Sequence, residues 1–120
     1  MGRRSTILVA EDDRLLRSLA LEVLQDEGYQ AIGADSGAEA LAHLCNHSDV
    51  ELLISDINMP GMNGLDLARL AKAQLPALKT LIISGRERVE AASLPQPGAF
   101  LQKPFSVSGL LAIVRHLLSL

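Results

Sequence analysis

The sequence predicts an α/β domain built on a doubly wound parallel sheet. Short runs rich in Ile, Leu and Val alternate with longer stretches in which apolar residues recur at the helical period. Such alternation is typical of parallel sheets, because parallel neighbours need a crossover and the crossover helices cover both faces. No internal repeat, low-complexity tract or linker interrupts the pattern, so residues 1–120 are expected to form one domain.

Five short apolar runs are expected to be the strands. Each is bounded by Gly, Pro or polar residues, and the last run is the weakest strand candidate. The expected strands are residues 6–10, 29–34, 52–55, 79–84 and 99–102.

The stretches between these runs are expected to be helices. Ser36 and Glu39 form a capping box, and Asp13 is a candidate N-cap of the first helix. In that first helix, Arg17 lies on the polar face opposite a leucine-rich stripe. Pro95 and Pro97 limit a fourth segment, residues 86–94, to about two turns. The other expected helices are residues 15–28, 38–47, 64–75 and 108–120.

Composition narrows the class of function. The 120 residues are 48% hydrophobic, which is enough to bury a core, and the formal net charge is -3. The chain has two Phe, one Tyr and no Trp, so direct binding of nucleic acid is not expected. Neither a secretion signal nor a run of about 20 apolar residues is present, so we expect a cytoplasmic location and no membrane span.

The single cysteine and the three histidines are not expected to carry chemistry. A lone Cys45 cannot form an intrachain disulfide, and its place in a helix predicts a packing role. His43, His47 and His116 lie in predicted helices, away from the strand ends.

Polar residues gather at the carboxyl ends of the predicted strands. In doubly wound sheets this edge carries the functional site. Taken singly, Asp56 with Asn58 resembles an ordinary turn, and Ser84 and Lys103 resemble ordinary loop residues. Four strand ends that each supply a polar or charged group favour a shared site. The groups are Glu11, Asp12 and Asp13 after the first strand, Asp56 after the third, Ser84 and Gly85 at the fourth, and Lys103 and Pro104 after the fifth.

The acidic residues of this set need a cation. If the first and third strands are neighbours, Asp12 and Asp56 face each other, and like charges about 5 Å apart cost roughly 3 kcal/mol at an effective dielectric near 20. Carboxylates without His or Cys suit Mg²⁺ or Mn²⁺. Lys103 and the Ser84 hydroxyl, with the amides near Gly85, are suited to phosphoryl oxygens. Asp56 is the carboxylate best placed to accept a phosphoryl group.

Four stretches resemble the receiver domain of bacterial two-component response regulators over nearly the whole chain. They are "ILVAEDDRLLR", "LLISDINMPGMNGLDL", "LIISGRE" and "AFLQKPF". The pattern D-x-x-M-P-x-M-x-G-x-x-L corresponds to Asp56, Met59, Pro60, Met62, Gly64 and Leu67. The resemblance implies a flavodoxin-like (βα)5 fold with five parallel strands in the order 2-1-3-4-5.

The resemblance also implies roles for the acidic residues. Asp56 is expected to be the phosphoacceptor and a metal ligand. Asp12 is expected to ligate the metal directly, with Glu11 acting through water and Asn58 contributing its backbone carbonyl. The implied cofactor is Mg²⁺ or Mn²⁺.

The remaining site residues resemble the phosphate-binding and switch positions of the family. Lys103 is expected to bridge the acceptor and the phosphoryl group, with a cis peptide bond to Pro104. Ser84 and Gly85 are expected to contact the phosphoryl group, and Phe100 matches the aromatic switch position. Phosphorylation is expected to draw Ser84 inward and let Phe100 follow.

The implied activity is transfer of a phosphoryl group to Asp56 from a phosphohistidine of a sensor histidine kinase or histidine phosphotransfer protein. The receiver assists its own phosphorylation and dephosphorylation, acts on a downstream protein target, and is not an enzyme in the usual sense. Two alternatives are a metal-dependent aspartyl-phosphate hydrolase of small phosphate esters and a binding module with a vestigial site. Asn58 stands where such a hydrolase has its second Asp, which argues against the first alternative.

The sequence departs from the family pattern between Ser84 and Lys103, where the interval is a few residues short. We expect the segment "RERVEAASLPQPGA" to be the most irregular part of the fold. A short fourth helix there predicts an altered partner surface and weak or no homodimerisation.

Overall fold

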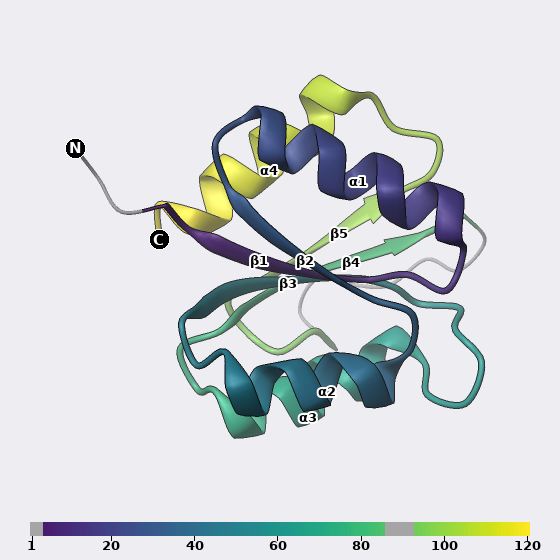
Figure 1. Cartoon of the computed structure of the whole chain (residues 1–120), viewed down its shortest axis with the longest axis vertical. Coiled ribbons are helices and arrows are strands. Elements are labelled where there is room, and N and C mark those ends of the chain that lie inside the picture. The colour runs from purple at the N-terminus through teal and green to yellow at the C-terminus, as the bar shows by residue number, and fades with distance from the viewer. Residues whose placement is uncertain (1–3, 86–92) are drawn as a thin grey trace.

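The computed structural model describes residues 4–85 and 93–120. Strands and helices alternate along most of the chain (Figure 1). The elements are β1 (Thr6–Ala10), α1 (Arg14–Asp26), β2 (Gln30–Ala34), α2 (Gly37–Asn46), β3 (Val50–Asp56), α3 (Gly64–Gln74), β4 (Lys79–Ser84), β5 (Gly98–Gln102) and α4 (Val107–Leu118).

The five strands form one parallel sheet in the order β2-β1-β3-β4-β5. Helices α1 and α4 cover one face, and α2 and α3 cover the other (Figure 1). This confirms the predicted doubly wound fold and strand order. The winding direction reverses between β1 and β3, so their carboxyl ends border the crevice in which such folds bind ligands.

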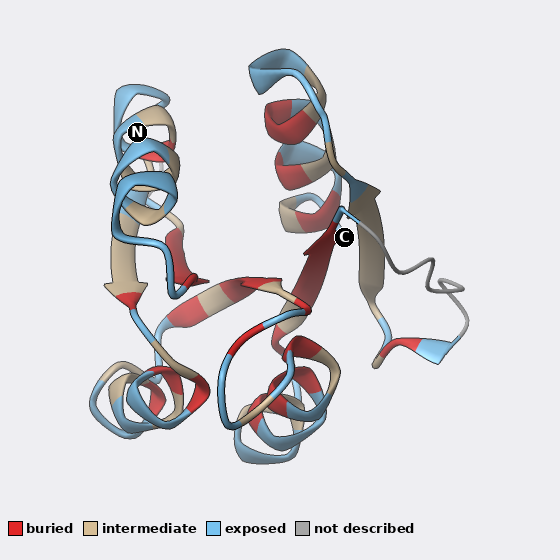
Figure 2. Cartoon of the chain, turned by 90° about the vertical axis from the view of Figure 1, so that its right-hand side faces the viewer, coloured by how far each residue is buried: buried red, intermediate tan, exposed pale blue. Residues whose placement is uncertain are grey.

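The core lies on both faces of the central strands. All five residues of β1 are buried, and so are most residues of β3 and β4. Figure 2 shows the buried positions on the central strands and on the helix sides that face them. Ile7 and Ile54 pack toward α1 and α4, whereas Leu8 and Leu53 pack toward α2 and α3. The alternation of side chains along each strand therefore assigns neighbouring residues to opposite cores.

The helix starts follow the predicted capping residues. The Asp13 side chain accepts a hydrogen bond from the Leu16 amide at 3.0 Å. The Ser36 hydroxyl accepts a hydrogen bond from the Glu39 amide. The Glu39 carboxylate in turn accepts one from the Asp35 amide at 2.8 Å. Side chains of this kind satisfy amide groups that a helix start leaves unpaired.

Cys45 does not lie where the sequence predicted. Cys45 is exposed and accepts a hydrogen bond from Gln74 Nε2, so the predicted packing role is wrong; α2 turns its neighbour Leu44 into the core instead. Most of the predicted fourth helical segment, residues 86–92, lies outside the described residues. Among the helices that are described, none has the length and apolar character needed to cross a bilayer.

Candidate functional site

The register of the central strands brings two acidic residues together. Ala10 of β1 pairs with Ser55 of β3, so the following residues, Glu11 and Asp56, lie beside each other at the sheet edge. Ile54, two residues before Asp56, belongs to the core under α1 and α4. Asp56 therefore points to that same face of the sheet, because side chains alternate along a strand.

Asp56 is held through both carboxylate oxygens. Oδ1 accepts a hydrogen bond from the Asn58 amide at 3.0 Å, and Oδ2 accepts one from Lys103 Nζ at 2.9 Å. The Asp56 side chain is 12% exposed, so it is largely shielded yet open to a reactant. A carboxylate fixed in this way presents its oxygens in a defined direction, as a nucleophile requires.

Lys103 follows the edge strand β5, which lies two positions from β3 in the sheet, and its side chain reaches Asp56. Its backbone amide donates to the Ser84 carbonyl at 2.8 Å, which extends the pairing of β4 and β5, and its peptide bond to Pro104 is cis. Partial burial lowers the pKa of the Lys103 ammonium, but the hydrogen bond and charge of Asp56, with the charges of Glu11 and Asp12, outweigh it. The net pKa is raised, so this lysine remains a cation at neutral pH.

Glu11 is the most buried acidic residue of the site, at 8% exposed. Its Oε2 accepts a hydrogen bond from the Asp13 amide at 3.0 Å. Burial is the main reason that the pKa of Glu11 rises to about 7; Asp12 and Asp56 add to the rise, and the Asp13 amide and Lys103 oppose it. A cation bound beside Glu11 would favour the charged form of this buried carboxyl group.

Of the other predicted site residues, Ser84 and Gly85 lie at the end of β4, and Phe100 lies on the opposite face of the sheet from Asp56. Ser84 is fully buried at the end of β4, and Gly85 lies against the Lys103 side chain. Phe100 pairs with Ile82 in the sheet and packs in the apolar cluster under α3, on the opposite face from Asp56. Phe100 is therefore not a contact of the acceptor carboxylate in this conformation.

The acidic set fits a divalent cation. Within residues 4–85 and 93–120, no three His, Cys, Asp or Glu side chains are arranged to hold a metal by themselves. Mg²⁺ does not need such a cage, because it uses one or two carboxylates, keeps several waters and takes phosphate oxygens. Asp12, Asp56 and the Asn58 carbonyl could supply oxygen ligands of the kind that Mg²⁺ takes, and Glu11 could act through water.

Sequence reasoning missed two contributors. Arg17 Nη1 donates to the Glu11 backbone carbonyl at 2.7 Å, although its helix position indicated only a polar face. Phe105 helps to line a cavity of about 210 Å³ beneath the site. The cavity is mostly apolar and extends between α1 and α4, with Glu11, Asp56 and Lys103 at its polar end. The Lys-Pro-Phe run was the only sequence signal for Phe105.

Comparisons with known proteins agree with this geometry. The family model described as response regulator receiver domain matches residues 7–115. The response regulator receiver protein CpdR of Brucella abortus is 35% identical over 115 residues, which cover 93% of this chain and 95% of CpdR. The transcriptional regulatory protein PdtaR of Mycobacterium tuberculosis is 33% identical over 110 residues, 90% of this chain and 54% of PdtaR. The chain thus spans about half the length of PdtaR.

Solved structures show the same fold. The receiver domain of the hybrid histidine kinase CckA superposes with a TM-score of 0.84 at 33% identity, covering 95% of this chain and 99% of that one. The chemotaxis protein CheY4 of Vibrio cholerae gives a TM-score of 0.86 at 26% identity, covering 96% and 99%.

The fold is of the flavodoxin-like class, and receiver domains with this fold are signalling domains rather than classical enzymes. The chain belongs to the response regulator receiver domain family of two-component systems. Receiver domains of response regulators are phosphorylated by histidine kinases and generally bind Mg²⁺ at the phosphorylation site.

Proposed function

We propose that Asp56 accepts a phosphoryl group from a phosphohistidine of a sensor histidine kinase or histidine phosphotransfer protein. The observation that carries this proposal is the 2.9 Å contact between Asp56 Oδ2 and Lys103 Nζ beside Glu11. A carboxylate, a cation and further acidic groups at one crevice are the parts that phosphoryl transfer to an aspartate needs.

In the transfer, an oxygen of Asp56 attacks phosphorus, the P–O bond forms, and the P–N bond of the phosphohistidine breaks. The leaving imidazole nitrogen keeps the bond electrons and takes up a proton from solvent. Lys103 neutralises charge on the phosphoryl oxygens, and its raised pKa keeps it charged for that role. Water later hydrolyses the acyl phosphate and returns Asp56 to its free form.

The metal belongs to the same proposal. Asp12, Asp56 and the Asn58 carbonyl would hold Mg²⁺ or Mn²⁺, with Glu11 acting through water. When bound, the ion supplies positive charge to the phosphoryl oxygens and orients them.

Ser84 and Phe100 are proposed to change position when Asp56 is phosphorylated. Ser84 is fully buried at the end of β4, and Phe100 lies on the neighbouring strand in register with Ile82. A hydroxyl drawn toward the phosphoryl group would leave space on this part of the sheet, and Phe100 would move into it. The surface around β5 would then change shape for a downstream protein target.

An apolar surface beside the site suits a protein phosphodonor. It consists of exposed side chains on α1, at the start of α4 and just before α4: Leu15, Leu16, Leu19, Val107 and Phe105. Contiguous exposed apolar side chains next to a reactive group are typical of protein interaction sites. We further propose a single cytoplasmic domain, residues 1–120, with weak or no homodimerisation and no direct contact with nucleic acid or membrane.

Beryllofluoride, which imitates the acyl phosphate, tests the proposal directly. Titration with Mg²⁺ present should give saturable amide chemical-shift changes around Asp56, Ser84 and Phe100. Asp56→Asn should abolish them. Asp26→Asn, which alters an exposed carboxylate at the end of α1, should leave them unchanged.

Phosphotransfer from candidate kinases supplies the second half of the test. Radiolabel from a phosphorylated kinase should move to the wild-type chain and not to Asp56→Asn. Steady turnover of p-nitrophenyl phosphate without a kinase would instead support the hydrolase alternative. Absence of any beryllofluoride response in the folded wild type would support a vestigial binding module.

A further inference from the structure

Arg17 secures the acidic turn that follows β1. Glu11, the first residue of this turn, is held at three points. Its amide donates to the Ala34 carbonyl at 3.0 Å, its carbonyl accepts from Arg17 Nη1 at 2.7 Å, and its carboxylate accepts from the Asp13 amide at 3.0 Å. The carbonyl is part of the peptide unit that joins Glu11 to Asp12, so the Arg17 contact fixes the orientation of that peptide plane.

A glycine on the edge strand leaves room for this arginine. A Cβ at Gly33 of β2 would lie 3.2 Å from Arg17 Cδ and 3.4 Å from Arg17 Cγ. It would also lie 3.0 Å from Leu21 Cδ1. The backbone of Gly33 is not in the left-handed region, so conformation alone does not demand glycine there. The missing side chain instead leaves room for the Arg17 stem to lie close against β2.

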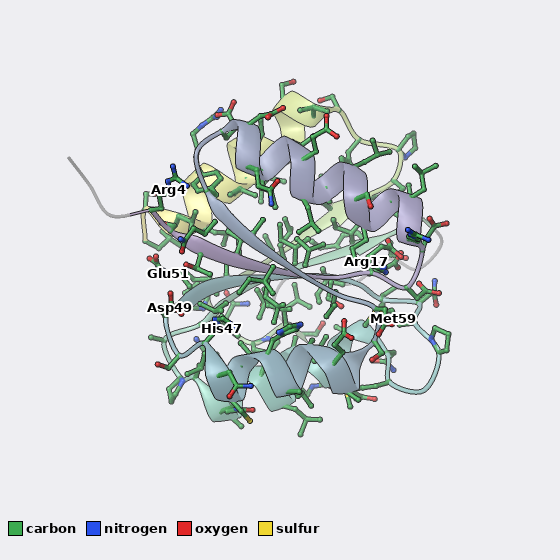
Figure 3. The ribbon with its side chains drawn as sticks, viewed as in Figure 1. Arg4, Arg17, His47, Asp49, Glu51 and Met59 are labelled. Atoms are coloured by element: carbon green, nitrogen blue, oxygen red, sulfur yellow. The ribbon has the colours of Figure 1, made fainter. Side chains whose placement is uncertain are left out.

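The arginine lies at the functional end of the molecule. Figure 3 shows Arg17 and Met59 at the end of the sheet where the acidic turn lies, whereas Arg4, His47, Asp49 and Glu51 gather at the opposite end. The hydrogen bond from Arg17 Nη1 is short and partly buried, and its donor is charged, which strengthens such bonds. Loss of that donor would leave the carbonyl without its charged partner.

We propose that Arg17, supported by Gly33, is a positioning residue for the divalent cation site. It acts through the Glu11–Asp12 peptide and sets the direction in which the Asp12 carboxylate points. The inference rests on the proposed function, because it assigns Asp12 to the cation. Groups that orient metal ligands typically change metal affinity by about 10- to 100-fold when removed.

The direction in which Mg²⁺ affinity changes when Arg17 is replaced distinguishes a positioning role from a simple effect of charge. Arg17 is itself a cation near the site, so its loss would tighten Mg²⁺ binding if charge alone mattered. Loss of a positioning contact has the opposite effect and weakens binding. A purely structural contact would lower the melting temperature and leave Mg²⁺ affinity unaltered.

Mg²⁺ affinity of the unphosphorylated chain, measured by isothermal titration calorimetry, tests this assignment. Arg17→Met keeps the apolar stem and removes the donor, and it should weaken binding about tenfold. Arg17→Lys restores a donor on a similar stem and should recover part of the affinity. Gly33→Val should weaken binding in the same direction by displacing the stem.

Arg14→Met is the matched control, since Arg14 is an exposed arginine at the start of the same helix. It removes the same charge without touching the Glu11 carbonyl and should leave affinity unchanged or slightly tighter. Equal or tighter Mg²⁺ binding by folded Arg17→Met would overturn the positioning role alone. Absence of Mg²⁺ binding by wild type would overturn the metal part of the proposed function and the inference with it. Thermal melts without Mg²⁺ establish whether each variant folds. If Arg17→Met does not fold, the Mg²⁺ affinities of Arg17→Lys and Gly33→Val test the positioning role instead.

Discussion

The two faces of the sheet are closed to different degrees. Under α2 and α3, the buried residues Leu8, Leu44, Leu53 and Leu67 form a continuous core, and the two helices contact each other. Under α1 and α4, a cavity of about 210 Å³ opens between the helices and reaches Asp56. Of the apolar residues of α1, only Leu24 is fully buried.

The two faces therefore have different roles: one holds the strand ends in place, and the other leaves Asp56 open to a reactant. The α2/α3 face anchors the strand ends, because α3 begins directly against the backbone that follows Asp56. The α1/α4 face leaves apolar side chains half exposed where the acceptor carboxylate opens to solvent. Substitutions on the first face should therefore affect stability, and substitutions on the second should affect phosphotransfer.

The largest expected effect comes from Leu44→Ala on the closed face. Leu44 is 1% exposed, and its truncation should lower the free energy of unfolding by about 4 kcal/mol, because transfer and cavity costs add. Chemical denaturation monitored by circular dichroism measures this change. Leu19→Ala is the matched control on the open face, since Leu19 is 49% exposed.

Leu19→Ala should cost less than about 1 kcal/mol, while slowing phosphotransfer from a kinase. Its phosphorylation by a small-molecule phosphodonor should stay at the wild-type rate. If Leu19→Ala proved as destabilising as Leu44→Ala, the two faces would not differ in the way described.

The next largest effect is expected from Gly64→Ala, which tests whether the closed face anchors the site. A Cβ at Gly64 would clash with the Asp56 carbonyl oxygen and would lie 2.9 Å from Ile57 Cα. Both neighbours are backbone atoms that cannot move aside, so Gly64→Ala should cost about 3 kcal/mol and impair the beryllofluoride response. The three atoms nearest to a Cβ at Gly37 all belong to the flexible Met62 side chain, with Sδ at 2.8 Å. Gly37→Ala should therefore cost about 1 kcal/mol, and equal costs at the two glycines would contradict the anchoring role.

Most of the site was predictable because strand alternation and the parallel sheet are local and topological rules. Side-chain alternation and the β1–β3 register bring Glu11 to Asp56 without any knowledge of loop structure. Arg17 was not predictable in this way. On a helical projection it lies on the polar face, and only the glycine at position 33 of another element gives its side chain a buried path.

The burial of Cys45 and the start of β3 were also not predictable from local sequence patterns. The burial of a residue at the border of a helical stripe depends on the rotation of the helix, which tertiary packing sets. Glu51 interrupts the apolar run of β3, so the expected strand began at residue 52, although pairing starts at Val50. Backbone pairing with β1 extends the strand across this charged residue.

The buried carboxyl group of Glu11, at the polar end of the open face, should make the stability of the protein depend on pH. The pKa of Glu11 is raised from 4.5 to about 7, mainly by burial, so between these values the folded chain keeps a proton that the unfolded chain has lost. The unfolded state then binds fewer protons, and the stability of the metal-free protein should fall as pH rises through this window. Melts in EDTA at several pH values measure the slope.

Glu11→Gln should flatten this part of the stability profile, since its amide does not titrate. Asp26→Asn, at an exposed position, should keep the wild-type slope. Stability that rises with pH between 4.5 and 7 in the metal-free wild type would contradict the assignment of the raised pKa to Glu11.

The smallest expected effect concerns an ion pair that joins the helices of the open face at the end remote from Asp56. Arg115 Nη1 of α4 lies 3.7 Å from Glu27 Oε2 at the end of α1, and both side chains are well exposed, at 58% and 43%. Water and salt screen such pairs, so Glu27→Gln should change the free energy of unfolding by less than about 0.5 kcal/mol and leave phosphotransfer unaltered. A loss above about 1.5 kcal/mol that disappears at high salt would mean that the pair holds α1 against α4. The open face would then depend on a specific charge contact, and the cavity would be a rigid feature rather than a gap between two independently anchored helices.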